Sequence, residues 1–210
     1  QYAGPWYFIR NQMGPAGYGA IKWRVQDRVV FVNNTIISGI NHAQYVMKTI
    51  SRNNLFIGGD PIWTGRDLSS ESAHASSYSP PQWLPSWNTD VDYNGFDWGG
   101  DTNRAFAWYN MTAYYPDLKS FAGAVGVERN GIRVNRNLIF EDFVISRDRS
   151  LTLNPSGNAV DAGSYLPNLA DFYLGSAPDL GAHEAGVAPV HFGPRNGTVL
   201  HQKTLHWAKH

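Results

Sequence analysis

An acidic stretch in the middle of the chain, TDVDYNGFDWGGD, carries oxygen-bearing side chains at the spacing of a calcium-binding loop. Asp90, Asp92 and Asn94 alternate along it, a glycine follows, and Asp101 ends it. Such loops need oxygen ligands at alternate positions, a glycine for the sharp turn and a final carboxylate. Asp90, Asp92, Asn94 and Asp101 are therefore candidate ligands, and Ca²⁺ is the candidate cofactor.

A local interpretation of the same stretch stays open. Asp97 stands where calcium loops usually carry an aliphatic residue, and the flanking residues have no helical periodicity. Short Asp side chains also bond nearby backbone groups in solvated turns. The stretch is then a strand that enters a turn, with no bound ion.

Three tryptophans, Trp63, Trp83 and Trp87, lie in a polar, Ser- and Pro-containing segment, 60–90. A loop of this length inside a compact domain is usually functional or disordered. Aromatic faces pack against the apolar faces of sugar rings, so exposed tryptophans would form a sugar-binding platform along one wall of a groove. Alternatively, they are buried and fix the loop to the domain.

The composition excludes several classes of protein. The 17 basic residues balance the 17 acidic residues, so no global field attracts nucleic acid or anionic lipid. No apolar run approaches the ~20 residues of a membrane helix. Because Cys is absent, the chain has no disulfide and no thiolate metal site.

Short strands are the elements that must position these residues. Runs such as WYFIRN, RVVFVNNTIIS and IRVNRNLIFEDFVIS are rich in Val, Ile, Phe and Tyr, and long helical periodicity is missing. The strands also repeat, because VVFVNNTIISG aligns with TISRNNLFIGG at a shift of 20 residues. An asparagine recurs at one or two such periods: Asn11, Asn34, Asn54, Asn94 and Asn137.

A repeat of this length without helices predicts an all-β solenoid. Asparagine tolerates the left-handed conformation and carries both a donor and an acceptor. Stacked at one strand spacing, ~4.8 Å, the amides can bond one another and the turn backbone. We therefore expect Asn34 and Asn54 to be neighbours in one turn of roughly four to six stacked coils.

The asparagine series resembles the right-handed parallel β-helix proteins of the pectin-lyase-like fold. The closing segment, 151–186, is similar to the last part of bacterial secreted β-helix repeat proteins through Asp161-Ala162-Gly163 and the run APDLGAHE at 177–184. The resemblance covers most of residues 5–195. It implies a right-handed parallel β-helix with the inserted loop 60–90, a β-helix domain over 1–195 and a C-terminal tail, 196–210.

The resemblance implies chemistry on polysaccharides, because the family includes lyases, glycoside hydrolases and epimerases. Lyases need a base beside cations that stabilise an enolate, and glycosidases need two or three carboxylates. The candidate catalytic residues are Lys48, Arg52, His74 and Asp97, and Arg104 joins the three tryptophans as a candidate for substrate binding. No motif ties a base to a cation, so each charge is also consistent with a solvated surface.

Three functions stay open on these grounds. The first is an extracellular or cell-surface carbohydrate-active β-helix protein that binds or cleaves a polysaccharide. The second is a non-catalytic structural solenoid that assembles with other chains, and the third is a calcium-dependent adhesion module. Since the first coil has no cap, we also expect another chain to cover it, either the other half of a precursor or a neighbouring subunit.

Overall fold

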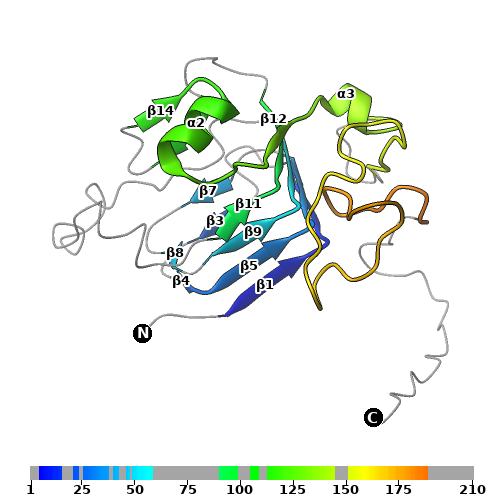
Figure 1. The fold of residues 1–210 in the computed structure, drawn as a ribbon, viewed down its shortest axis with the longest axis horizontal. Helices are drawn as coiled ribbons and strands as arrows, with labels where there is room; N and C mark the ends of the chain where they lie inside the picture. The colour runs from blue at the N-terminus through cyan, green and yellow to red at the C-terminus, as the bar shows by residue number, and fades with distance from the viewer. Residues whose placement is uncertain are drawn as a thin grey trace, which may run out of the picture.

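The structure is a computed structural model that describes residues 5–15, 21–23, 26–37, 40–42, 46–47, 49–58, 90–98, 105–108, 113–144 and 151–188. Most of its regular elements are short strands in parallel sheets, and helices are few. Figure 1 shows the strands stacked above one another, with helix α2 (Leu118–Val125) at one end and the yellow and orange closing segment along one side. No helix of the described residues is long and apolar enough to span a membrane. The tail 196–210 and all of the loop 60–90 except Asp90 lie outside the description.

Two parallel sheets form the stack. The first has the order β1-β5-β9-β11, with β1 (Trp6–Ile9), β5 (Val29–Val32), β9 (Ile50–Arg52) and β11 (Asp90–Asp92). The second has the order β15-β12-β10-β6-β2, with β2 (Gln12–Met13), β6 (Thr35–Ile37), β10 (Leu55–Ile57), β12 (Gly95–Asp97) and β15 (Ile132–Arg133). We call one passage of the chain through both sheets a layer: β1–β2 is layer 1, β5–β6 layer 2, β9–β10 layer 3 and β11–β12 layer 4. Parallel strands in two sheets are consistent with a parallel β-solenoid.

Smaller pairs of strands complete the sheet structure. Layers 1 and 2 continue into two further parallel pairs, β3 (Ile21–Trp23) with β7 (Ile40–His42) and β4 (Gln26–Asp27) with β8 (Val46–Met47). The strands β13 (Phe106–Trp108) and β14 (Ala113–Tyr115) form an antiparallel pair before α2. A second, short helix, α3 (Arg136–Ile139), follows β15.

Each layer turns between the two sheets through a left-handed residue. Arg10, Asn33, Asn53 and Tyr93 have φ values of 53°, 52°, 58° and 57°. This conformation is uncommon for side chains other than Asn, Asp and Gly, so the surrounding bonds must hold it. The backbone N–H of Asn33 donates to the Arg52 oxygen at 3.1 Å, and that of Asn53 donates to the Tyr93 oxygen at 3.0 Å. The left-handed turns of layers 2 and 3 are therefore each bonded to the turn of the next layer, while the Tyr93 N–H donates to Asp92 Oδ1 at 2.9 Å.

The residue after each left-handed position is an asparagine, and these asparagines form a ladder. Asn34 donates from its backbone N and from Nδ2 to Asn54 Oδ1, both at 2.9 Å. Asn11 donates in the same way to Asn34, and Asn54 to Asn94. The predicted pairing of Asn34 with Asn54 is confirmed, and one amide oxygen accepts from two donors at each of these three steps.

The prediction that Asn137 continues this ladder is wrong. Asn137 is exposed in α3, and its backbone N–H donates to Asn135 Oδ1 at 3.0 Å. Asn135 is the N-cap of α3, so the run VNRN starts a helix and does not turn between sheets. The spacing alone could not separate these two uses of asparagine.

Phenylalanine rings fill the interior of the stack. Their centroids lie 5.0–6.3 Å apart along a chain of six rings: Phe8, Phe31, Phe56, Phe96, Phe106 and Phe121. Offset or edge contacts at these distances add to the burial of apolar area. On the other face of the second sheet, Leu55 and Ile57 pack with Ile139, Leu153 and Leu180. The second sheet is thus buried on both faces.

The closing segment lies over the left-handed turns. Asn33 Nδ2 donates to the Asp179 oxygen at 2.9 Å, and Asn53 Nδ2 donates to the Ser164 oxygen at 2.8 Å. In return, the Gly181 N–H donates to the Asn53 oxygen at 2.8 Å. The first asparagine of each NN pair therefore binds the closing segment, while the second builds the ladder.

Replacing Gly181 with Ala is expected to lower the free energy of unfolding by about 2–4 kcal/mol. Gly181 has a φ of 95°, and an added Cβ would lie 2.6 Å from Thr35 Oγ1 and 2.7 Å from Leu55 Cδ1. Gly186→Ala is the control, because Gly186 has a φ of 76° but its nearest neighbour, Leu174 Cδ1, would be 3.6 Å away. Urea denaturation should show the larger loss at Gly181, and equal losses would contradict the close contact.

Helix α2 covers the end of the stack beyond layer 4. Asp117 caps its N-terminus by accepting from the Ser120 N–H at 2.7 Å, and Gly126 ends it in the left-handed conformation. Leu118 and Phe121 are its buried residues, and Phe121 stacks on Phe106. The helix therefore closes the aromatic core at this end.

Gly123→Ala is expected to stabilise the protein by about 0.5–1 kcal/mol, since glycine in a helix interior has excess conformational freedom in the unfolded chain. Gly123 is exposed, and an added Cβ would meet no atom within 4 Å. The midpoint of urea denaturation should rise with an unchanged slope. A lower midpoint would show that the methyl group meets an obstacle.

Candidate functional site

A buried carboxyl group, Glu128, ends the asparagine ladder. Its Oε1 accepts from Asn94 Nδ2 at 2.6 Å and its Oε2 from the Asn94 N–H at 3.3 Å. In the strand register, Ile132 pairs with Gly95, and its N–H donates to the Asn94 oxygen at 2.9 Å. The residue before it, Gly131, therefore pairs with Asn94 and occupies the position of the next asparagine. A Cβ on Gly131 would lie 2.9 Å from Glu128 Oε2. The Glu128 carboxyl therefore fills the space of the missing asparagine side chain.

Burial changes the acidity of this carboxyl. Glu128 is 1% exposed, and loss of water around it raises its pKa to about 8. The two hydrogen bonds from Asn94 and the charge of Arg52 act in the opposite direction, while the charge of Asp92 raises the pKa further. The protonated form consequently predominates near neutral pH.

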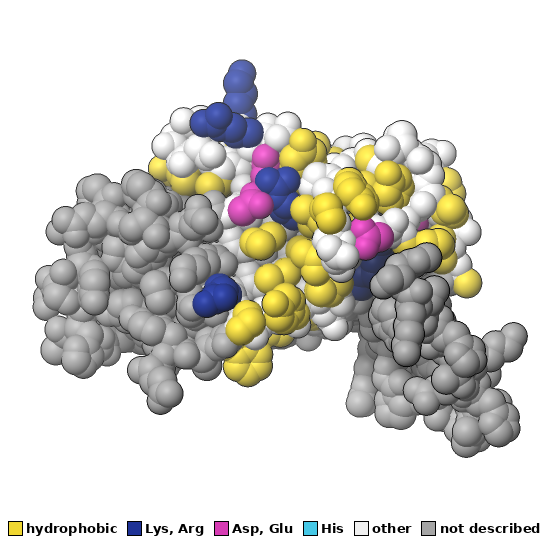
Figure 2. Space-filling view, turned by 60° about the horizontal axis from the view of Figure 1, so that its bottom comes forward, with side chains coloured by type: hydrophobic (Ala, Val, Ile, Leu, Met, Phe, Trp, Pro, Cys, Tyr) yellow, Lys and Arg dark blue, Asp and Glu magenta, His cyan; other side chains and the backbone are white. Residues whose placement is uncertain are grey.

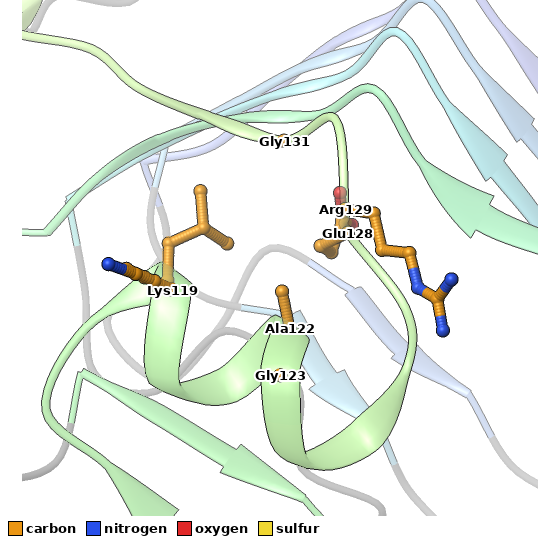
Figure 3. A pocket seen from close by; sticks show the side chains of 7 residues that line it. Lys119, Ala122, Gly123, Glu128, Arg129 and Gly131 are labelled. Atoms are coloured by element: carbon orange, nitrogen blue, oxygen red, sulfur yellow. The ribbon is translucent and has the colours of Figure 1, made fainter.

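A hollow of about 490 Å³ opens beside Glu128, and we call it the α2 hollow. It is lined by Leu118, Lys119, Ala122, Gly123, Glu128, Arg129 and Gly131. Figure 3 shows Lys119, Ala122 and Gly123 on α2 along one side, and Glu128 and Arg129 on the loop opposite. Lys119 and Arg129 are exposed cations. The small side chains at Ala122 and Gly123 keep the helix side of the hollow open.

This arrangement combines a buried, largely protonated carboxyl with two exposed cations. Lys119 and Arg129 can bind an anionic group at the rim, and the CH surface of Leu118 and Ala122 is apolar. The hollow thus suits a ligand with both an anionic and an apolar face.

Two of the predicted catalytic residues lie among the described residues, and each has an ion-pair partner. Arg52, at the end of β9, donates to Asp90 Oδ1 at 2.6 Å, and this hydrogen bond raises the pKa of the guanidinium. Asp97, at the end of β12, pairs with Arg136 at 2.7 Å. Arg52 and Asp97 belong to different sheets. Their catalytic role stays a prediction.

The predicted calcium ligands also have protein partners. Asp90 accepts from Arg52, and Asp92 accepts from the backbone N and from Nδ2 of Asn130 at 2.7 and 2.8 Å. Asn94 is buried within the ladder. Within the described part of the chain, no three acidic or histidine side chains are grouped so that they could share a metal ion. Calcium at this stretch stays a prediction, and binding would have to replace these hydrogen bonds.

The remaining predicted site residues lie outside the described residues. They are Lys48, Trp63, His74, Trp83, Trp87, Asp101 and Arg104.

A second cluster of buried charges lies in the closing segment, where the sequence analysis placed no site. Burial raises the pKa of Asp179 and of Glu184 and lowers that of His183. Asp179 accepts from the Asp161 and Ala185 N–H groups at 2.7 and 2.6 Å. Glu184 accepts from the Leu174 N–H at 3.0 Å. Both carboxylates therefore bind loop N–H groups, and both belong to the run APDLGAHE.

Sequence reasoning also missed Glu128, although a signal was present. The run ERNGIRV resembles DYNGFDW and SRNNLFI, and this likeness suggests another layer near residue 130. A direct overlay would have put Asn130 in the ladder. In the structure Asn130 binds Asp92, and the glutamate two residues earlier supplies the acceptor.

Comparisons of the chain with protein-family models, with curated proteins and with solved structures found no match.

Proposed function

We propose that the chain is a right-handed parallel β-helix protein of the pectin-lyase-like kind that binds an acidic polysaccharide in the α2 hollow. The parallel layers, the asparagine ladder and the APDLGAHE run support the fold. The observation that carries the function is the hollow itself, which joins two exposed cations to a buried, largely protonated carboxyl.

The chemistry of an acidic sugar matches the lining of the hollow. Two uronate carboxylates of one chain would pair separately with Lys119 and Arg129, whose charged ends point to opposite sides of the hollow in Figure 3. The apolar face of a ring would lie on Leu118 and Ala122. Near neutral pH the protonated Glu128 adds no negative charge that would repel the ligand. An uncharged polysaccharide would leave both cations without a partner, so we expect acidic chains to be preferred.

Lyase cleavage is a second candidate function, because two cations at the rim of the hollow, Lys119 and Arg129, could stabilise an enolate. Glu128 is 1% exposed and both of its oxygens accept from Asn94, so it is not the base of this reaction. Glu128→Gln should therefore leave any cleavage in place.

The test is a panel of acidic and neutral polysaccharides, read by retention on affinity gels and by the ultraviolet absorbance of unsaturated products, with and without chelator. Lys119→Gln with Arg129→Gln should lower the affinity for acidic chains by about tenfold or more, as expected for two lost ion pairs of ~1 kcal/mol each. Gly123→Leu should also weaken binding, because it fills the hollow. Arg133→Gln is the matched control, because Arg133 is an exposed cation that does not line the hollow. Its guanidinium carbon lies 4.6 Å from the centre of the Trp98 ring.

Equal affinity of the double variant and the Arg133 control would contradict the site. Binding that disappears with chelator alone would favour the calcium-dependent adhesion module. Retention of neutral chains only would contradict the preference for an acidic ligand.

A further inference from the structure

The dipeptide Asn-Gly occurs three times in the chain, at 94–95, 130–131 and 196–197. In such a pair the backbone nitrogen of the glycine can attack the side-chain amide carbon of the asparagine, because glycine has no Cβ to hinder the approach. The third pair lies outside the described residues, and the first two lie at the starts of the neighbouring strands β12 and β15. Their surroundings differ, and this difference decides which of them reacts.

The first pair is buried, and both of its residues are held by hydrogen bonds. Asn94 is fully buried, and its Oδ1 accepts two hydrogen bonds from Asn54. Its Nδ2 donates to the Ser51 oxygen at 2.9 Å and to Glu128 Oε1 at 2.6 Å. The Gly95 N–H donates to the Asn54 oxygen at 2.8 Å. Attack at Asn94 would require the ladder to open, and buried elements open only with a large share of the global free energy of unfolding.

The second pair lies in the exposed turn before β15. Asn130 is exposed, and its backbone N–H and Nδ2 both donate to the Asp92 carboxylate, at 2.7 and 2.8 Å. The Gly131 N–H donates to the Glu128 oxygen at 3.2 Å. Hydrogen bonds of an exposed turn open at a much lower free energy than those of a buried strand. The Gly131 nitrogen and the Asn130 amide can therefore meet while the two sheets stay intact.

We propose that Asn130 is a modification site, at which the folded chain converts this asparagine spontaneously to aspartate or isoaspartate. The Gly131 nitrogen gives up its proton to solvent and forms a bond to Asn130 Cγ, and the side-chain nitrogen leaves as ammonia. Water then opens the resulting five-membered imide at one of its two carbonyl carbons. One opening gives aspartate, and the other gives isoaspartate, in which the main chain runs through Cβ. Water is the only other reactant.

Either product disrupts the contact between Asn130 and Asp92. A carboxylate oxygen replaces the donor Nδ2, which now lies 2.8 Å from Asp92 Oδ2, and two like charges at such a distance repel each other. Figure 2 shows acidic side chains beside basic ones on that face of the molecule, so a contact between two carboxylates would depart from this arrangement. Isoaspartate also lengthens the main chain by one atom between Arg129 and Gly131, which both line the α2 hollow (Figure 3). We therefore expect the modification to loosen the turn beside the hollow.

Peptide mapping by mass spectrometry tests the site on the full chain, incubated folded near neutral pH. Asn130 should be converted at least about tenfold faster than Asn94, because a tenfold ratio of rates needs only a small part of the free energy that opens the ladder. In the chain unfolded by urea the two residues should react at similar rates, since both precede glycine. Asn130→Gln should stay unmodified, because its longer side chain would have to close a less favourable six-membered ring. Conversion of Asn130 in the folded chain no faster than that of Asn94 would overturn the proposal.

Asn130→Asp reproduces the aspartate product and measures its effect on the turn. The midpoint of urea denaturation should fall in this variant. It should recover when Asp92→Asn is added, because the exchange again places an amide donor against a carboxylate. Equal midpoints of Asn130→Asp and the wild type would contradict the expected loosening. Neither measurement involves a polysaccharide, so both outcomes are independent of the proposed function.

Discussion

Replacing Asn54 with leucine is expected to lower the free energy of unfolding by about 3–5 kcal/mol, the largest loss that we expect from any single substitution in this chain. Asn54 is fully buried and lies in the middle of the ladder. It accepts two hydrogen bonds from Asn34 and donates to Asn94 Oδ1 and to the Phe31 oxygen. Leucine would leave these buried groups without partners, and each such group costs about 1–3 kcal/mol. Because small domains are stable by only about 5–15 kcal/mol, much of the variant should be unfolded at moderate urea concentrations.

Asn137→Leu is the matched control for this experiment. It makes the same chemical change at an exposed position in α3 and should alter the stability by less than about 0.5 kcal/mol. Urea denaturation followed by tryptophan fluorescence measures both variants. A loss at Asn54 no larger than that at Asn137 would show that the ladder contributes little to stability.

The parts of the fold that repeat within 20 residues were predictable from the sequence. Asn34 and Asn54 stand in register because both follow a left-handed asparagine in a short strand–turn–strand unit, and this local pattern is visible in the amino acids. Parallel strands follow from it. Asn137 misled the prediction because it lies within α3, two residues after the capping Asn135, in a run whose residue types resemble those of the turns between the sheets.

The candidate site was less predictable, for reasons of distance along the chain. Arg52 and Asp97 look like free charges in the sequence, yet their partners, Asp90 and Arg136, come 38 and 39 residues later. Glu128 is an ordinary acidic residue until Gly131 leaves a space at the ladder position and Asn94 brings two donors to it. Its altered acidity is a property of the folded chain alone.

Glu128 is expected to make the protein less stable as the pH rises from about 4.5 to about 8. Its folded-state pKa of about 8 lies above the ordinary value of 4.5, so the folded chain keeps a proton that the unfolded chain releases over this interval. Stability from this group is fully present below about pH 4.5 and is lost as the pH approaches 8. The whole interval removes on the order of several kcal/mol.

Glu128→Gln isolates this contribution. Glutamine is neutral at every pH and offers Asn94 an amide oxygen, which is the acceptor that the rest of the ladder uses. The wild type and the variant should therefore have similar stability near pH 4.5, and the variant should be the more stable protein at pH 8. Burial also raises the pKa of Asp179 and of Glu184, but these groups are present in both proteins and cancel in the difference. Urea denaturation at each pH unit from 5 to 9 gives the free energy of unfolding of both proteins. If the two curves of this free energy against pH are parallel, Glu128 is ionised in the folded chain over the whole range. In that case the ladder would end on a charge, and the α2 hollow would repel the acidic sugar that we propose for it.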